Sequence, residues 1–520
     1  MNETKKFLGE NGLATLITSI KTLFSSHTEN DKVHVPVLSK PDQVLIINSQ
    51  GKYQWVDQSS LIGGNNEYFL DTLSYGISWV PNQKDPKCER IGNISLHRSQ
   101  PILSKFRGCV AKGSDIQYYL DANDWALKED GTPSRLDGFD GNVDVDTGAD
   151  FYIKSYASQN INWVRISEHR IDETWTRVPR MLIHAYRSTV LNTVPENMGW
   201  LSTLPVGSMI SVRNTAAYCR GGNNRSSYDT FFTDNPFKSD LGKPRTYMSR
   251  SSARTAMRKT GDELLSYEEY KNIFCWLWAI EYASFYMQDV YNDELTTDGF
   301  KQGGMGAGAN WDSTSWSNFN SYYPVIPCGY TNDLGNKTGI KPLTIPATSN
   351  TTTKTFNTFR WHGFECDWDI WTNLDGFLMN TSVNSGNDVL PQALIFTDPA
   401  KYTDSLMGAQ PDRIITGARN SGYILEFNLG TSADIVPGAI GGNVSQGKTD
   451  YYWVNYDDNP EALLVGANLN NGSNCGFFTF NVNNHVSNSW TNVGFRDIIY
   501  KNLRRGVPWL LPKHNVEPLF

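Results

Sequence analysis

Residues 462–496 read ALLVGANLNNGSNCGFFTFNVNNHVSNSWTNVGFR, and the interpretation of the whole chain starts from this stretch. Asparagine tolerates left-handed backbone conformations and hydrogen-bonds its own main chain, so repeated Asn with Gly and Ser predicts a series of tight turns. The apolar side chains between these turns require burial: Phe477, Phe478, Phe480, Val482 and Val493. We therefore expect a folded, turn-rich surface held by a few apolar anchors and closed by Gly494-Phe495-Arg496.

The composition of the chain narrows the class of protein. Its 520 residues are enough for two to four domains. Aromatic residues make up 12% and charged residues only 19%, which is typical of β-rich domains with neutral polar surfaces. The net charge of −8 argues against a nucleic-acid partner, since affinity for phosphate depends on clustered Lys and Arg.

Cysteine and histidine spacing gives no sign of a metal or cofactor. The seven cysteines are scattered without a CxxC pair, and no HExxH or HxH motif occurs. We interpret the cysteines as free thiols of a protein assembled in a reducing cytoplasm. The polar N-terminus lacks the apolar run of a signal peptide. The longest apolar stretch, residues 273–287, contains Glu281 and is too short to cross a bilayer, so it predicts a buried helix and no membrane insertion.

The first 70 residues combine a short helix, linkers and a hairpin. Residues 12–24 have apolar residues spaced by three and four, as in an amphipathic helix. This helix, within residues 1–30, either packs within its own chain or self-associates into a short bundle that anchors the protein. In residues 31–70, a linker leads to two strands at 43–56 around a turn at 49–51. The apolar stripe consists of Leu13, Leu16, Ile17, Ile20, Leu23 and Phe24.

The remaining chain divides into two predicted domains. Short apolar runs broken by turn residues predict a β-rich spacer domain over residues 71–200. Its stretch LDGFDGNVDVDTGAD, residues 136–150, suggests calcium, but Val145 stands where an EF-hand loop needs Gly, so strand and turn geometry explains it better. Residues 201–520 predict helices at 251–258 and 267–287, then loop-rich chain with short strands. The expected fold class is α+β and β-rich multidomain.

Several blocks of the second domain resemble a known family. They are the two helices, a glycine-rich run ending in Asn310-Trp311, the blocks Gly363-Phe364-Glu365 and Asp369-Ile370-Trp371, and the terminal GAN…GFR. Together they resemble the C-type-lectin fold of the formylglycine-generating-enzyme branch, and the tail is similar to the variable regions of proteins targeted by diversity-generating retroelements. The blocks RIGNISLHRSQPI and RGGNNRSSYD resemble tailed-bacteriophage fibre proteins. The start FLGENGLATLITSIK looks like a phage-fibre attachment helix, a type that commonly trimerises.

This resemblance implies a host-receptor-binding adhesin, a tail or head fibre that is assembled in the host cytoplasm and located in the virion. It would be a homotrimer, joined to other virion proteins by its N-terminus, and would bind a cell-surface carbohydrate. Rigid rings surrounded by adaptable amides and hydroxyls suit a recognition face. The predicted ligand-binding residues are Leu469, Asn470, Asn474, Cys475, Thr479, Phe480, Val482, His485 and Trp490.

Other functions remain as alternatives. A head or collar decoration protein would use the same lobe to bind another virion protein. A glycan-degrading enzyme needs two facing carboxylates, for which the acidic residues at 365, 367, 369 and 375 are candidates. An oxidase would need a reactive cysteine pair, and Cys475 has no second cysteine close by in sequence. We therefore expect no enzymatic activity.

Overall fold

The computed structural model describes the backbone of residues 43–47 and 53–57 and, with side chains over most of their length, residues 66–223, 236–306, 325–345, 353–366, 368–381 and 390–500. The chain divides into two compact units, Met1–Asn66 and Glu67–Phe520. The predicted anchor stripe of Leu13, Leu16, Ile17, Ile20, Leu23 and Phe24 lies outside the described residues. So does the pair Asn310-Trp311.

In the first unit, β1 (Gln43–Ile47) and β2 (Tyr53–Asp57) form an antiparallel hairpin in which Gln43 is opposite Asp57. The predicted hairpin is therefore confirmed. Helix α3 (Asn66–Leu73) then leads into the second unit.

The second unit is rich in β-structure, with 38% strand against 14% helix in the chain, so the β-rich class is confirmed. Two antiparallel sheets come mainly from the predicted spacer range. The five-stranded sheet has the order β10 (Thr176–Val178), β8 (Phe151–Ala157), β9 (Asn162–Ser167), β3 (Tyr75–Trp79) and β4 (Glu89–Gly92). The six-stranded sheet has the order β15 (Glu263–Leu264), β30 (Asp497–Tyr500), β11 (Met181–His184), β7 (Asn142–Asp146), β5 (Arg107–Lys112) and β6 (Asp115–Tyr119).

The six-stranded sheet corrects the predicted domain layout. Strands β15 and β30 belong to the range 201–520, yet they lie in one sheet with strands from 71–200. Both ranges also share one hydrophobic core, which contains Tyr75 as well as Ile498. The two ranges therefore do not form separate compact units, because the last described strand pairs with β11, far earlier in the chain.

A nine-stranded sheet carries the tail of the chain. Strand β29 (Val493–Gly494) pairs in parallel with the start of β21. The main path is β23 (Arg413–Thr416), β22 (Gln392–Ile395), β21 (Trp371–Asn380), β27 (Pro460–Gly466), β28 (Gly476–His485), β26 (Tyr451–Val454), β24 (Gly422–Leu429) and β25 (Ile435–Ile440).

Smaller elements complete the unit. The small sheets contain β12 (Thr189–Leu191), β13 (Met209–Ile210) and β14 (Cys219–Arg220), then β16 (Tyr291–Asn292) and β17 (Gln302–Gly303), then β18 (Gly339–Ile345), β19 (Lys354–Trp361) and β20 (Phe364–Glu365). The short helices are α4 (Ile94–Ser99), η1 (Leu103–Lys105), η2 (Gly199–Thr203), η4 (Pro236–Lys238), η8 (Asn332–Leu334), η9 (Pro399–Lys401) and η10 (Gly472–Asn474).

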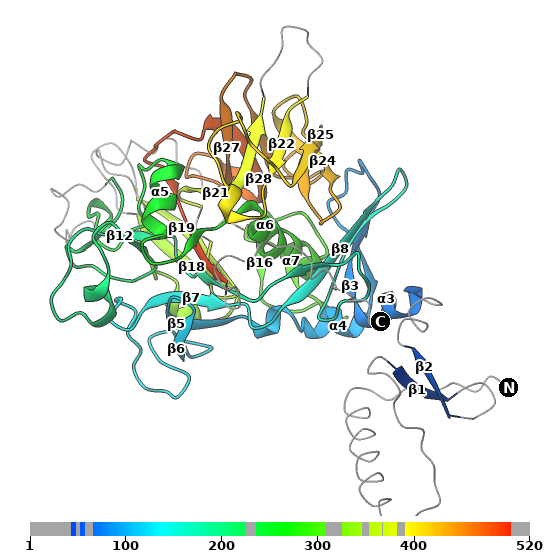
Figure 1. The fold of residues 1–520 in the computed structure, drawn as a ribbon, viewed down its shortest axis with the longest axis horizontal. Coiled ribbons are helices and arrows are strands. Elements are labelled where there is room, and N and C mark those ends of the chain that lie inside the picture. The colour runs from blue at the N-terminus through cyan, green and yellow to red at the C-terminus, as the bar shows by residue number, and fades with distance from the viewer. Residues whose placement is uncertain are drawn as a thin grey trace, which may run out of the picture. The chain divides into compact units, whose positions relative to one another are not determined.

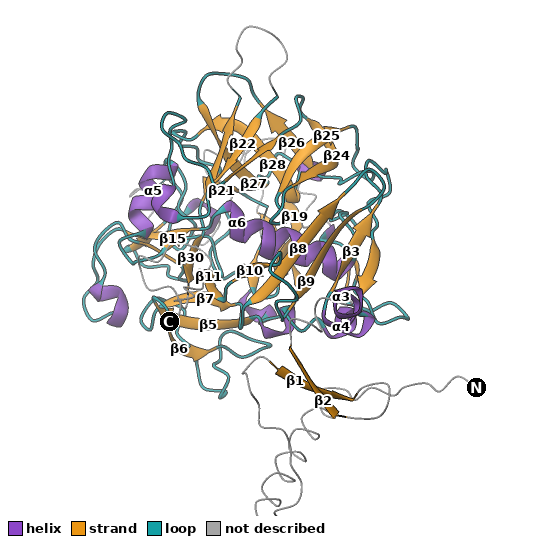
Figure 2. Ribbon diagram, turned by 45° about the vertical axis from the view of Figure 1, so that its right-hand side comes forward, coloured by secondary structure: helices purple, strands orange, loops and turns teal. Residues whose placement is uncertain are grey.

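The predicted apolar helix is the centre of the core. It runs as α6 (Tyr267–Tyr270), the π-helical turn η5 (Lys271–Trp276) and α7 (Leu277–Tyr282), and it lies between the nine-stranded and five-stranded sheets (Figures 1 and 2). Ser266 caps its start by accepting from the Glu268 N–H, and its hydroxyl donates to the Glu269 carboxylate. The helix ends before the predicted residue 287 because Ala283 adopts a left-handed conformation. No helix among the described residues is both long enough and apolar enough to span a membrane.

Candidate functional site

The tail hairpin forms one wall of a surface groove. Strands β27 and β28 pair antiparallel, and β28 also pairs in parallel with β26. A groove of about 420 Å³ lies over these strands, and we call it the asparagine groove. It is lined by Trp371, Trp453, Leu464, Asn468, Asn471, Asn481, Asn483, Asn484, Trp490, Thr491, Asn492 and Val493.

Strand alternation places the amides of β28 in this groove. Successive side chains of a strand point to opposite faces. Phe480 and Val482 are buried in the core, at 2% and 0% exposure, whereas Asn481 and Asn483 line the groove. The Asn481 side-chain oxygen accepts from the Asn484 amide at 3.0 Å and from the Asn483 N–H at 3.3 Å. These bonds hold the three amides against one another.

The loop between β27 and β28 adds two more amides. The Asn471 side-chain oxygen accepts from the Asn468 N–H at 2.8 Å, and the Asn468 oxygen accepts from the Asn470 N–H at 2.9 Å. These local bonds are the turn chemistry expected of Asn. They use the side-chain oxygens, and within the described residues the NH₂ groups of Asn468 and Asn471 donate to no protein atom. Because both residues line the groove, these donors are candidates for hydrogen bonds to a ligand acceptor.

Aromatic rings form the other part of the lining. The rings of Trp371 and Trp453 meet edge to face, with centroids 5.6 Å apart, and Tyr451 packs against Trp453 at 4.4 Å. Trp490 is 50% exposed at the edge of the groove. An indole presents an apolar face together with one N–H donor, so it suits ligands that are partly apolar and partly polar.

Backbone bonds fix the loop that carries Trp490. The carbonyl oxygen of Trp490 accepts from the Tyr247 N–H at 2.9 Å, and the Trp371 N–H donates to the Asn492 carbonyl at 2.8 Å. The Val493 N–H also donates to the Trp490 carbonyl, at 3.3 Å. The rim of the groove is therefore held from β21 and from the segment before α5, which favours a preorganised binding surface.

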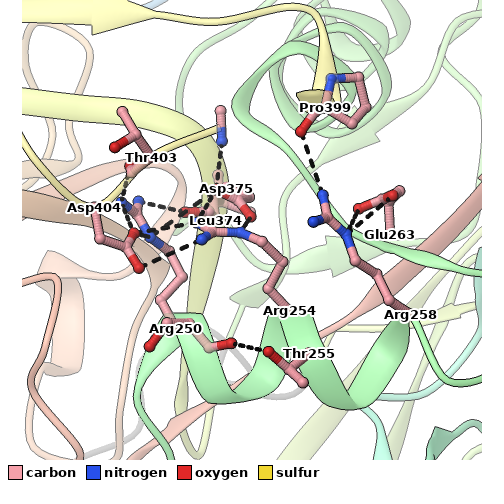
Figure 3. Close-up of polar contacts among 12 residues, drawn as sticks. Arg250, Arg254, Thr255, Arg258, Glu263, Leu374, Asp375, Pro399, Thr403 and Asp404 are labelled. Atoms are coloured by element: carbon pink, nitrogen blue, oxygen red, sulfur yellow. Dashed lines mark hydrogen bonds and ion pairs between the residues drawn. The ribbon is translucent and has the colours of Figure 1, made fainter. Parts of the chain in front are cut away.

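Helix α5 (Arg250–Met257) is in turn bound to β21 by two arginines (Figure 3). Arg250, fully buried, donates to the Asp404 carboxylate at 2.7 Å and to the Phe377 carbonyl at 2.8 Å. Arg254 makes two bonds to Asp375, at 2.5 and 2.8 Å. Because β21 begins at Trp371, this ion-pair network anchors the strand that forms the base of the groove.

The closing block Gly494-Phe495-Arg496 ties the tail to the rest of the unit. Arg496 donates to the carbonyls of His184 and Ala185 at 2.6 and 2.9 Å, and to the Glu365 carbonyl at 2.5 Å. Phe495 is fully buried. The sequence-based prediction that this block closes the segment is confirmed.

Five of the nine predicted ligand-binding side chains are buried, which corrects the prediction that they are displayed. Phe480 and Val482 point into the core because residues 476–485 form the strand β28 and not a series of turns. Thr479 is fully buried and donates to the Asn474 carbonyl at 3.0 Å. The other two, Leu469 and Cys475, also pack in hydrophobic clusters.

The other four predicted residues reach the surface. Trp490 lines the asparagine groove, whereas Asn470, which is exposed, and Asn474, which is half-buried, lie outside its lining. His485 is half-buried and faces the Glu461 carboxylate at 3.4 Å. The amides that do line the groove were interpreted from sequence as turn formers. The alternation TFNVN in β28 is the signal that places Asn481 and Asn483 on the groove face of the strand, opposite Phe480 and Val482.

The acidic candidates for glycan cleavage are engaged in structural bonds. The Glu365 carboxylate accepts from the Thr331 N–H and the Gly329 N–H at 2.8 and 2.9 Å. Asp369 is buried and pairs with Arg187 at 2.7 Å, and Asp375 pairs with Arg254. Residue 367 lies outside the described residues.

Another depression, of about 1180 Å³, lies beside β24 and the β8–β9 turn. Its charged groups are already paired within the protein. Arg413 pairs with Asp434 at 2.7 Å, and Glu426 accepts from the Trp79 indole N–H at 3.1 Å. We therefore take the asparagine groove, whose described lining residues carry no ionisable side chain, as the candidate site.

None of the seven cysteines, all of which lie in the described residues, forms a disulfide, as expected from their spacing. Cys475 is buried, and burial raises the pKa of its thiol well above the usual range. This environment does not favour the thiolate that a cysteine-based oxidase requires.

No protein-family model matches the chain, and no curated protein matches it.

Proposed function

We propose that this protein is a receptor-binding fibre protein of a tailed bacteriophage, and that it binds a host-surface carbohydrate in the asparagine groove. The observation that carries the proposal is the lining of the groove, in which neutral amides and indole rings occur together and no charged side chain is present among the described lining residues. Sugar hydroxyls both donate and accept hydrogen bonds, which matches asparagine amides. Their apolar C–H faces match tryptophan rings.

The finer parts of the proposal come from the sequence resemblance. Residues 201–520 would contain the C-type-lectin-like elements of the formylglycine-generating-enzyme branch, integrated with the preceding β-rich residues into one compact unit. An N-terminal helix would attach a homotrimer to the virion. Three grooves on one particle would compensate for weak single contacts through avidity.

The test is binding of the purified full chain to a glycan array and to polysaccharide extracted from the host strain. Truncating a tryptophan that acts as a binding hot spot costs about 2 kcal/mol or more, roughly a 30-fold loss of affinity. We expect this loss for Trp490→Ala and for the double variant Asn483→Ala/Asn484→Ala. Tyr156→Ala is the matched control, because Tyr156 is an aromatic side chain of 49% exposure outside the groove.

Thermal unfolding confirms that each variant is folded. If glycan binding by the wild type is unchanged in both groove variants, the asparagine groove is not the receptor site. If the wild type binds only purified virion proteins and no glycan, the decoration-protein alternative replaces the adhesin.

A further inference from the structure

A second cluster of polar side chains lies inside the six-stranded sheet, away from the asparagine groove. His184 ends β11 and is directly opposite Asp144 on β7. Asp497 begins β30, and Asp262 directly precedes β15. These four residues are at most 2% exposed. Four chain segments that are far apart in sequence thus bring three carboxylates and one imidazole together.

The distances from the His184 ring to the carboxylates are too long for hydrogen bonds and fit a shared metal ion. The His184 Nε2 atom lies 3.7 Å from an Asp144 oxygen and 4.0 Å from an Asp262 oxygen. Direct N–H···O bonds end near 3.2 Å. Two ligand atoms that each bind a metal at about 2.1 Å are roughly 3.4 Å apart at a tetrahedral angle, and further apart at wider angles. His184, Asp262 and Asp497 also place one ligand atom each within 4.8 Å of the others.

The surrounding hydrogen bonds orient the imidazole for this role. Ser188 Oγ donates to Asp497 Oδ1 at 2.7 Å, so it accepts from His184 Nδ1 at 3.0 Å. The proton is thereby placed on Nδ1, and the Nε2 lone pair points toward Asp144 and Asp262. A metal-binding histidine typically has its other ring nitrogen held in this way.

Buried ligand atoms of the cluster have unmet hydrogen-bonding capacity that a cation would fill. Both Asp144 carboxylate oxygens are buried and have no hydrogen-bond partner, and His184 Nε2 also has none. Arg496, the nearby guanidinium, donates to backbone carbonyls. A buried carboxyl group without partners is costly, and a divalent cation would satisfy it.

We infer that Asp144, His184, Asp262 and Asp497 bind one divalent first-row transition metal ion in a closed structural centre. Imidazole is a ligand for Zn²⁺ and its neighbours, carboxylates suit Mn²⁺ as well, and four buried protein ligands leave no open position. The sequence predicted no metal because the four ligands come from separate segments and form no spaced motif. The metal joins β7, β11 and β30 with the residue preceding β15, and this inference does not depend on the function of the groove.

The test is the metal content of the full chain, with ZnCl₂ and MnCl₂ as the probes. We expect close to one equivalent of metal per chain by elemental analysis, either as purified or after dialysis against one of these salts. Removal by EDTA should lower the melting temperature, and re-addition of the bound metal should restore it; comparison of the two salts identifies the metal.

Asp144→Asn keeps the shape of the side chain and should reduce bound metal at least tenfold. Asp450→Asn is the matched control, because Asp450 is likewise fully buried with an oxygen that lacks a partner, but is not part of this cluster. Metal content below about a tenth of an equivalent in the wild type after dialysis against both salts, with a melting temperature unaffected by either, would overturn the inference and indicate a cluster of protonated carboxyl groups. If Asp144→Asn does not fold, the wild-type metal content and its EDTA response decide.

Discussion

Replacing Arg250 with methionine should destabilise the second unit far more than replacing Arg258, the C-cap residue of the same helix, with methionine. Arg250 is fully buried and donates to Asp404 at 2.7 and 2.9 Å and to the Leu374 and Phe377 carbonyls at 3.2 and 2.8 Å (Figure 3). Methionine fills similar space but leaves two buried carbonyls and part of a carboxylate without these donors. Breaking a buried pair in this way costs about 3–5 kcal/mol.

We expect a value near the lower limit, about 3 kcal/mol, because Arg254 still contacts Asp404 at 3.1 Å. Arg258 pairs with Glu263 at 2.9 Å, but its side chain is 44% exposed. Exposed ion pairs contribute about 0–1 kcal/mol, so Arg258→Met should cost less than 1 kcal/mol. The two variants thus separate the effect of burial from the loss of an arginine on α5.

The assay is equilibrium unfolding in guanidinium chloride at pH 7, comparing midpoints at a constant m-value. Where unfolding is irreversible, unfolding rates replace the equilibrium midpoints. In the Arg250→Met background, a further Asp404→Asn change should cost less than it does alone, since the two residues are coupled. If Arg250→Met lies within 1 kcal/mol of Arg258→Met, the argument that buried arginines hold α5 on β21 is wrong.

Three further predictions follow from burial. Burial and the neighbouring Asp457 raise the pKa of Glu461 to about 8, so the folded state binds an extra proton between about pH 4.5 and 8. The stability of the folded state therefore falls as the pH rises through this range, by up to about 1.4 kcal/mol per pH unit. The melting temperature of Glu461→Gln should depend less on pH than that of the wild type, and parallel curves would contradict this. Gly76→Ala should lower the free energy of unfolding, measured by heat or denaturant, by at least about 3 kcal/mol, because the added Cβ would lie 2.0 Å from the Val164 carbonyl oxygen. In the control Gly339→Ala the nearest contact of the added Cβ is at 3.4 Å, so this variant should be near neutral. Equal effects of the two substitutions would refute the predicted clash. Six of the seven cysteines are buried, so a thiol reagent at pH 8 should label the native protein slowly and the denatured protein fully; rapid native labelling of several thiols would show that the buried thiols are accessible.

The local parts of the fold could be predicted from the sequence. The apolar run with Ser266 and Glu269 at its start specifies a capped, buried helix, and these signals lie within a few residues of one another. The same holds for the hairpin of β1 and β2. The sequence predicted a domain boundary near residue 200 that the structure does not have, because β30 pairs with β11. Neither segment contains a local sequence signal for this long-range pairing.

The candidate site could be predicted only in part. The tail was identified as a surface rich in asparagine, and Trp490 lies at the edge of the groove. The prediction placed Phe480 and Val482 on the displayed surface and assigned the asparagines to turns. The structure buries these two apolar side chains and places asparagines of β28 in the groove. Once the segment is a strand, period-two alternation directs Phe480 and Val482 inward and Asn481 and Asn483 outward. Trp371 and Trp453 join the groove only through strand pairing.

The place of β30 within the six-stranded sheet has a consequence for biosynthesis. Asp497–Tyr500 is inserted between β11 and β15, two strands that emerge from the ribosome much earlier. In a nascent chain, β11 and β15 therefore lack their shared neighbour until residues 497–500 have been translated. Any product that stops short of this point retains two unpaired strand edges, which are open to intermolecular pairing.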